Sequence, residues 1–303
     1  MRAPSTRDAV GGAPLLAAAG VLWGGAGAAG RMLAGVGHLS SLQIAAGRAL
    51  LGGLALVAAA VLLRRPWLRG PGAARHVLTM AGLTVVYQSC YFAAVAAGSL
   101  SLATLVTLGS APVLVTGWHA LRHRRLSPAA LGVVALALVG LGLLVGRPDA
   151  GGDIGTVVTL SLVAGAAFAA MTLVNAEAVP GADHITATGV SFLVAGLGLA
   201  AALAVLPGSP PLAWSWPLAG WSAVLSVACT AAPYALYFTG LLRASAPVAS
   251  LFALLEPVTG TLIAVGVFGE RLGVLGWVGA GLLCGAVAAS ASTSDAGVRR
   301  PTP

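Results

Sequence analysis

Charged residues are scarce in this chain of 303 residues. They make up 8% of the sequence, whereas hydrophobic residues make up 58% and the mean hydropathy is +0.95. A soluble domain carries roughly a quarter charged residues, so a compact domain of this composition could not cover its surface with charge. The composition therefore excludes an ordinary water-soluble protein and predicts a chain that is solvated mainly by lipid.

Lysine is absent, so all 16 strongly basic side chains are arginine, and the formal net charge is +8. A basic balance can indicate nucleic-acid binding. The arginines fall between apolar runs rather than along one face, which favours a role in membrane orientation. We therefore predict no nucleic-acid partner.

Cysteine is rare, and the motifs of common enzymes are missing. Cys90, Cys229 and Cys284 each stand alone inside an apolar run, without a CxxC or Cys/His spacing. This pattern predicts small packed residues rather than disulfides or a zinc site. The chain also lacks GxSxG, HExxH, GxxxxGK[ST] and paired carboxylates. We predict no catalytic residue, no metal, no cofactor and no nucleotide site on this chain.

The sequence does contain ten long apolar segments. Each has about the 17–25 residues that a helix needs to cross a bilayer, and unbroken runs of this kind exclude a barrel of short alternating strands. We predict an all-α polytopic membrane protein with ten transmembrane helices, between tails at residues 1–12 and 292–303. The segments are 13–34, 40–63, 74–97, 100–121, 128–146, 154–176, 184–206, 217–241, 246–268 and 272–291.

Arginine placement predicts the orientation of these spans. With the N-terminus in the cytoplasm, twelve arginines fall on the inner side, and only Arg31, Arg147 and Arg271 fall on the outer side. The positive-inside rule favours this arrangement. We therefore predict a multi-pass protein of the bacterial inner-membrane type with both termini in the cytoplasm. The inner arginines are Arg2, Arg7, Arg64, Arg65, Arg69, Arg75, Arg122, Arg124, Arg125, Arg243, Arg299 and Arg300.

The chain repeats itself. Tyr91-Phe92 opens a stretch that matches the one opened by Tyr237-Phe238, and after a single-residue gap Pro112 matches Pro257. Two five-helix halves follow, at residues 13–146 and 154–291. An odd number of helices in each half places the halves in opposite orientations, as in secondary transporters with a site near the membrane midplane. Duplicated helices with only a structural role are the alternative.

At this point the sequence resembles the EamA-type family of the drug/metabolite transporter superfamily, over about residues 13–291. The resemblance is carried by Leu22-Trp23-Gly24, by Arg48-Ala49 and by LLEPVTGTLIAVGVFGERLGVLGWVGAGLL at 254–283. It implies a carrier of small organic solutes with ten helices in two EamA-like repeats.

The first half departs from the family pattern at its acidic positions. Where the family often has Gly-Glu-Arg-Leu, this chain has His123-Arg124-Arg125-Leu126, and Ala111 stands where the second half has Glu256. A role for such acids is therefore predicted only for the second half.

Glu256 is the central candidate because a carboxylate at membrane depth costs ~2.5–3.5 kcal/mol on insertion scales. Pro257 follows it and disturbs the preceding helical turn, since proline has no N–H to donate. Thr259 shares a helix face with Glu256. One interpretation is a site for a substrate amine or a proton, and proton coupling is a hypothesis. The other is a structural carboxylate that ties the kink to another helix.

Arg48 is the arginine placed well inside a span. At 1.5 Å per residue it lies ~12 Å from the outer edge, and Glu256 lies ~15 Å from either edge. Three interpretations stay open for Arg48: a salt bridge with Glu256, binding of a substrate carboxylate, or extension to the outer interface without a role.

Aromatic and polar residues in mid-span predict the rest of the site. Such groups can give an apolar cavity a few directing contacts, although packing with a satisfied hydroxyl is the simpler interpretation for any one of them. The predicted binding residues are Trp23, Arg48, Tyr87, Gln88, Tyr91, Tyr234, Tyr237, Glu256 and Thr259, and the predicted hinges are Pro112, Pro233 and Pro257.

Pairs of glycines four residues apart predict close helix packing. Gly20 and Gly24 form one such pair in the first span, and Gly281 and Gly285 form another in the last.

Together these features predict a secondary transporter, acting as an exporter, of small organic metabolites such as amino acids or related solutes. It would work by alternating access about a midplane site. The expected partners are a small solute, the lipid bilayer and, with coupling, protons; no oligomeric state is predicted. The alternatives are a membrane scaffold that transports nothing and a membrane-embedded enzyme, which would need a catalytic constellation.

Overall fold

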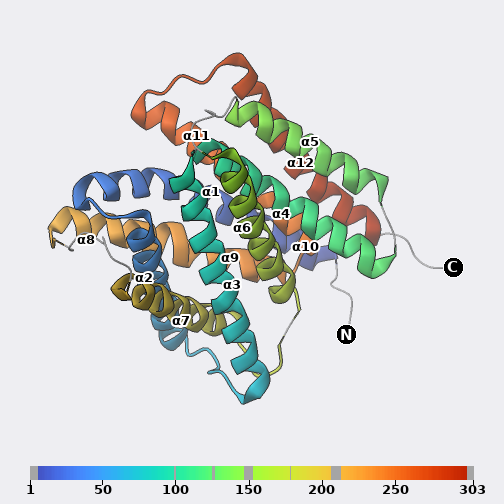
Figure 1. The fold of residues 1–303 in the computed structure, drawn as a ribbon. Helices are drawn as coiled ribbons and strands as arrows, with labels where there is room; N and C mark the ends of the chain where they lie inside the picture. The colour runs from blue at the N-terminus through green and yellow to red at the C-terminus, as the bar shows by residue number, and fades with distance from the viewer. Residues whose placement is uncertain are drawn as a thin grey trace.

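The computed structural model describes residues 6–98, 100–124, 127–146, 153–177, 179–205 and 213–298, with side chains from residue 12 to residue 291. Every regular element in these ranges is helical (Figure 1). The elements are α1 (Thr6–Gly37), α2 (Ser41–Leu62), α3 (Gly70–Ala97), α4 (Leu100–His123), α5 (Pro128–Val145), α6 (Ile154–Asn175), α7 (His184–Val205), α8 (Trp216–Ala223), the π-helix η1 (Val224–Ala231), α9 (Ala232–Leu241), α10 (Ala246–Phe252), α11 (Leu255–Phe268) and α12 (Val274–Val298).

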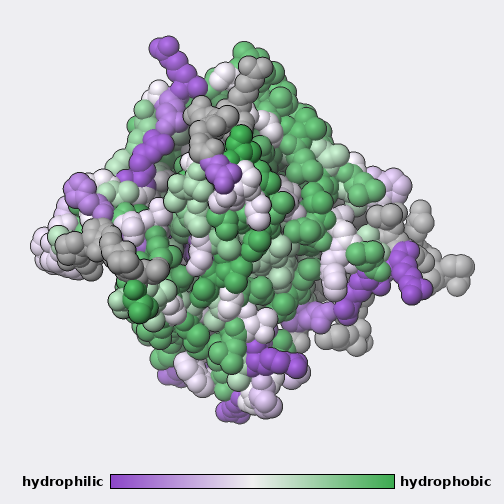
Figure 2. Space-filling view, viewed as in Figure 1, coloured by the Kyte–Doolittle hydropathy of each residue, from purple (hydrophilic) through white to green (hydrophobic). Residues whose placement is uncertain are grey.

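Ten helical segments in the described part of the chain are long and apolar enough to cross a membrane, with 18 to 28 residues each. The predicted ten spans are confirmed. The helices α8, η1 and α9 run on as the eighth span, and α10 and α11 form the ninth. Figure 2 shows a largely apolar face, with hydrophilic residues toward the edges of the view. At the ends of the chain, α1 reaches back to Thr6 and α12 runs on to Val298, beyond the predicted spans.

The two five-helix halves interlock with the symmetry of an inverted repeat. The corresponding helices α2 and α7 pack on each other, and so do α5 and α12 (Figure 1). The packing of α3 on α6 is matched by that of α9 on α1, and the packing of α4 on α6 by that of α11 on α1. The interface between the halves is therefore the core of the molecule. The half boundaries and the tails stay predictions.

Ion pairs join the helix ends in the way that alternating spans require. Arg65 lies 3.8 Å from Asp183, and Arg122 lies 3.4 Å from Glu177, all at the predicted inner end. At the predicted outer end Arg31 lies 2.9 Å from Glu270. The cytoplasmic placement of the termini stays a prediction. Six of the arginines on which the predicted orientation is based lie outside the described side chains: Arg2, Arg7, Arg125, Arg147, Arg299 and Arg300.

Side-chain caps begin three helices at the predicted outer end, α2, α6 and α8, the last of them capped by Ser215. Ser40 and Gln43 form a capping box at α2, in which the Ser40 N–H donates to Gln43 Oε1 and the Gln43 N–H donates to Ser40 Oγ. At α6, Asp153 accepts hydrogen bonds from the hydroxyl and the backbone N–H of Thr156, at 2.6 and 3.2 Å. Both hydrogen bonds lower the pKa of the Asp153 carboxyl, and the bond from the Thr156 hydroxyl has the larger effect. The helix starts are thus encoded locally.

The ninth span breaks one turn before Pro257. Because proline has no N–H, the carbonyl of Ala253 lacks its normal donor four residues on. The Glu256 N–H donates to that carbonyl instead, at 3.1 Å, and the Leu254 N–H donates to Leu251 at 3.0 Å. The helix therefore stops at Phe252 and restarts at Leu255, which confirms the predicted disturbance before Pro257.

The eighth span contains a feature that the sequence analysis did not predict, the π-helix Val224–Ala231. Here the Ala232 N–H donates to the carbonyl of Val227, five residues back. Pro233 follows and cannot donate to Cys229. Widened turns of this kind are frequent at functional sites, and this one faces α1 and α2.

Glycines allow α1 to pack closely on the broken ninth span. A Cβ at Gly20 would lie 2.9 Å from Leu255 Cβ, and a Cβ at Gly24 would lie 2.8 Å from the backbone nitrogen of Gly260. The prediction for this pair therefore agrees with the structure. The prediction for Gly281 and Gly285 is wrong, because a Cβ at either position would meet no atom within 4 Å. In α12 it is Gly279 that packs closely, against α5.

Candidate functional site

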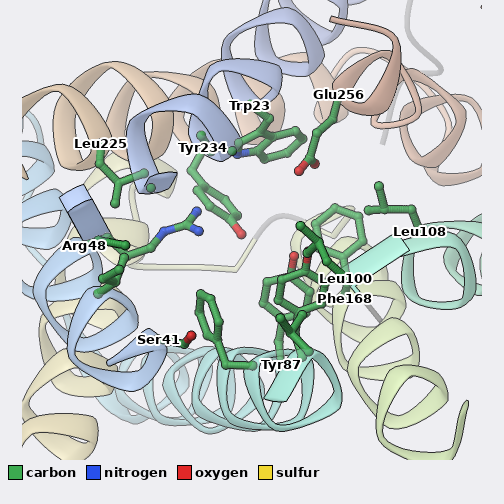
Figure 3. Close-up of a pocket in the computed structure, with 18 residues that line it drawn as sticks. Trp23, Ser41, Arg48, Tyr87, Leu100, Leu108, Phe168, Leu225, Tyr234 and Glu256 are labelled. Carbon is green, nitrogen blue, oxygen red and sulfur yellow. The ribbon is translucent and has the colours of Figure 1, made fainter. Parts of the chain in front are cut away.

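A cavity of about 260 Å³ lies between the two halves. It runs from Trp23 and Glu256 at mid-depth to Ala34, Ser41 and Leu100, which belong to helix ends at the predicted outer side (Figure 3). Its lining comes from seven of the spans. The lining residues are Trp23, Ala26, Gly27, Gly30, Ala34, Ser41, Ile44, Arg48, Tyr87, Tyr91, Phe92, Val95, Leu100, Leu108, Phe168, Leu225, Tyr234 and Glu256.

On the other side of Trp23 the interior is packed. One hydrophobic cluster continues from Trp23 and Phe168 through Tyr237 to Leu16 and Leu241, close to the predicted inner end. Tyr237 is fully buried, and its hydroxyl lies 3.1 Å from that of Thr172 on α6. The structure is therefore open toward the predicted outer end and closed toward the predicted inner end.

Glu256 reaches the cavity because the ninth span is broken. The break places this residue in the first turn of α11, where the exposed N–H groups of a helix N-terminus carry partial positive charge. Its carboxylate points into the cavity (Figure 3). Within the described part of the chain it has no side-chain hydrogen bond and no ion pair. Among the described residues, Glu256 therefore has no side-chain partner on another helix to which it could tie the kink.

Arg48 occupies the opposite wall, on α2. Its Nε donates to Thr230 Oγ1 at 3.2 Å, and the Thr230 hydroxyl donates to the carbonyl of Leu225, five residues back in the π-helix. The guanidinium points into the cavity, with the Tyr234 ring between it and Glu256 (Figure 3). Among the described residues no salt bridge joins Arg48 to Glu256. The two charges therefore face a common space rather than each other.

Aromatic rings form much of the wall between the two charges. The Trp23 ring lies 5.1 Å from the rings of Tyr234 and Tyr237 and 6.0 Å from that of Phe168. Tyr87 stacks on Tyr91, with 6.2 Å between ring centroids. Of these rings only Tyr237 does not line the cavity, because it lies behind Trp23 in the packed half.

The remaining predicted residues lie outside the cavity lining. Gln88 is 1% exposed, and neither polar atom of its amide has a hydrogen-bond partner among the described residues. Thr259 packs against Gly24 on α1. The predicted hinges differ from one another, because Pro257 and Pro233 lie in the first turns of α11 and α9 whereas α4 runs unbroken through Pro112.

Sequence reasoning missed Phe168 and Thr230. Phe168 could have been predicted. Pro112 and Pro257 are offset by 145 residues, and the same offset makes Phe168 the counterpart of Trp23 in the repeat. The repeat therefore predicts an aromatic pair at the centre. Thr230 gave no signal, since its role depends on the π-helix and on Arg48 from another helix.

Comparison with known proteins agrees with this architecture. The model of the EamA-like transporter family matches the chain twice, at residues 10–146 and 155–291. "Uncharacterized transporter YwfM" of Bacillus subtilis (strain 168) is 29% identical over 257 residues, which cover 80% of this chain and 81% of that protein. An "Uncharacterized transporter" of Archaeoglobus fulgidus is 27% identical over 214 residues, which cover 70% of this chain and 75% of that protein.

A solved crystal structure has the same fold. It superposes with a TM-score of 0.80 at 18% sequence identity and covers 94% of this chain and 98% of that one. Two matches to one family model, each over a five-helix half, also agree with the inverted repeat seen in the packing. The chain therefore belongs to the EamA-like transporter family and is a multi-pass membrane transporter.

Proposed function

We propose that this transporter exports small organic solutes that carry both an amino group and a carboxylate, such as amino acids. The observation that carries the proposal is the pair of opposite charges on facing walls of the cavity, Glu256 and Arg48, which are not paired with each other. A carboxylate recognises an ammonium group, and a guanidinium recognises a carboxylate. A zwitterion between them would satisfy both walls.

The size and lining of the cavity agree with a small solute that has an apolar part. A volume of about 260 Å³ lies just below the range of drug-sized pockets. The rings of Trp23, Tyr87 and Phe168 offer apolar faces between the charged groups. Desolvated charges with no solute between them are costly at membrane depth, so the cavity favours a solute that brings both complementary charges.

Alternating access supplies the transport mechanism. The cavity is open toward one end only, and it lies where two oppositely oriented halves meet, which is the arrangement of inverted-repeat carriers. Export requires the solute to enter at the inner end and leave at the outer end. In the proposed coupling, Glu256 carries a proton in one half of the cycle and meets the solute ammonium in the other.

The experiment is uptake by proteoliposomes of radiolabelled amino acids, free amines and carboxylates, with and without a pH gradient. Glu256→Gln keeps the size of the side chain and removes its charge. A charge-assisted hydrogen bond is worth ~1.5–3 kcal/mol, so we expect flux of zwitterions to fall by about 10–100-fold. Dependence on the pH gradient should disappear as well.

Glu270→Gln is the matched control, because it is the same substitution just beyond the other end of α11, at an exposed ion pair with Arg31. It should leave flux unchanged. If Glu256→Gln transports like wild type and keeps its response to the pH gradient, the role of Glu256 is refuted. Absence of flux for every solute in the panel would favour a scaffold.

A further inference from the structure

Three buried side chains in the described part of the chain have polar atoms without a hydrogen-bond partner, Gln88, Thr116 and Ser161, and of these Gln88 has two such atoms. It is 1% exposed on α3, and neither its amide nitrogen nor its amide oxygen has a partner among the described residues. Its neighbours on the helix are paired, since the Thr84 hydroxyl donates to Met80 at 2.8 Å and the Tyr91 hydroxyl lies 3.0 Å from that of Thr104. An unpaired buried amide is costly, so another state of the protein is expected to supply the missing contacts.

The position of Gln88 in α3 places it beside the inner part of the cavity. Residues three, four and seven positions on share its helix face, and these are Tyr91, Phe92 and Val95, which all line the cavity. The helix α3 runs from the predicted inner end to the predicted outer end, so Gln88 lies one turn deeper than Phe92, at the level of Tyr87, which is the lining residue of α3 nearest the predicted inner end.

The internal repeat identifies the counterpart of Gln88. Tyr91-Phe92 corresponds to Tyr237-Phe238, and the residue three positions earlier is Gln88 in the first half and Tyr234 in the second. Tyr234 lines the cavity while Tyr237 is buried in the closed half. In the first half the pattern is reversed, because Tyr91 lines the cavity while Gln88 is buried.

The lining and buried roles are thus reversed between the two halves. Two oppositely oriented halves in different conformations would produce this reversal. Because the halves have opposite orientations, an exchange of their conformations would open the other end, and in that exchange Tyr91 becomes a closing residue and Gln88 takes the position of Tyr234. The counterpart of Thr172, which contacts Tyr237, is Gly27, since the two family matches are offset by 145 residues at both ends. A Cβ at Gly27 would meet no atom within 4 Å, so space for Tyr91 exists there.

We propose that Gln88 binds the solute in the state open toward the predicted inner end, in the place that Tyr234 holds in the present state. Its amide both donates and accepts hydrogen bonds, so it can meet either charged group of a zwitterion. This inference rests on the proposed function, because it uses the same site and the same alternation of access.

Thiol labelling tests the exposure of Gln88 without any solute. In a variant whose native cysteines are replaced by alanine, Gln88→Cys, Ala34→Cys and Ala94→Cys are treated from either side of vesicles with a membrane-impermeant thiosulfonate. Ala34 lines the open cavity, whereas Ala94 is fully buried against Ala103 and Val157 and is the buried control. We expect Gln88→Cys to react from the side opposite to Ala34→Cys, and Ala94→Cys to react from neither.

The rate of labelling reports the population of the other state. A minor conformer is typically populated at 0.1–10%, so Gln88→Cys should react at about 0.1–10% of the rate of Ala34→Cys. Reaction from the same side as Ala34→Cys, or a rate no higher than that of Ala94→Cys, would overturn the inference.

Gln88→Met tests the binding role with an apolar side chain of similar length. Because the wild-type amide is unpaired in the present state, the variant should unfold at an equal or higher temperature while transporting a radiolabelled amino-acid mixture more slowly. A lower unfolding temperature would reveal a structural partner, and unchanged flux would show that Gln88 does not bind solute; either result overturns the proposal. If wild type transports no amino acid, the proposed function fails, whereas the labelling result still decides whether Gln88 becomes exposed.

Discussion

Gly24 offers a sharp test of how the site is positioned. This residue lies where α1 crosses α11, and a Cβ there would lie 2.8 Å from the backbone nitrogen of Gly260 and 2.9 Å from the carbonyl oxygen of Glu256. It would also collide with Thr259 Cβ. Two of these atoms belong to the backbone and cannot rotate away, so Gly24→Ala must displace α11, the helix that carries Glu256.

The expected cost follows from overpacking. An extra methyl group in a well-packed interior typically costs ~1–3 kcal/mol. The intrinsic preference of a helix for alanine over glycine returns up to ~1 kcal/mol. We therefore expect Gly24→Ala to lower the free energy of unfolding by a net ~0–2 kcal/mol relative to wild type. Relative to a Gly→Ala variant at a helix position where the methyl group meets no atom, the loss should be the full ~1–3 kcal/mol.

Gly27→Ala is that reference, because Gly27 lies on the same helix and a Cβ there would meet no atom within 4 Å. The assay is thermal unfolding of both purified variants in the same detergent, followed by circular dichroism. We expect Gly24→Ala to unfold at the lower temperature, and its flux to fall with the displacement of Glu256. If Gly24→Ala unfolds at or above the temperature of Gly27→Ala, the reasoning about the α1–α11 crossing is refuted.

Two further predictions concern the ends of α11. Pro257→Ala restores an N–H for the carbonyl of Ala253 and favours a continuous ninth span, so flux should fall while the unfolding temperature stays equal or rises; undiminished flux would show that the break is dispensable. Breaking the exposed pair between Arg31 and Glu270 with Glu270→Gln should cost no more than ~1 kcal/mol, measured by thermal unfolding at low and high salt, and a larger loss that persists at high salt would contradict this estimate.

Most of the fold could be predicted from the sequence because lipid leaves the chain few choices. A long apolar run must satisfy its own backbone hydrogen bonds, and only a helix does so within one segment. Span lengths and the break before Pro257 follow from this constraint and from proline chemistry, and the repeat is visible in the matching stretches of the sequence. The errors arose where packing between helices decides, as at Gly281 and Gly285, which have the spacing of a packed pair but open space around them.

The candidate site was predictable in its charges but not in its geometry. Glu256, Arg48, Trp23 and the tyrosines of α3 stand out because polar and aromatic groups are rare in such spans. Their separation also involves the π-helix, which was not predicted although Pro233 directly follows it. In this π-helix the hydroxyl of Thr230 donates to the backbone carbonyl of Leu225. The same hydroxyl accepts a hydrogen bond from Arg48, which lies on a different helix.

The two irregular turns explain why the opposite charges stay apart. A salt bridge between Glu256 and Arg48 would neutralise both walls and leave nothing to attract a zwitterion. The break before Pro257 starts a new helix at Leu255, so Glu256 projects from a helix end rather than from the middle of a continuous helix. The π-helix brings Thr230 to the Nε of Arg48 and anchors the guanidinium at its own wall. In the proposed mechanism the backbone irregularities are therefore as necessary as the charges, because they keep each charge available for the solute.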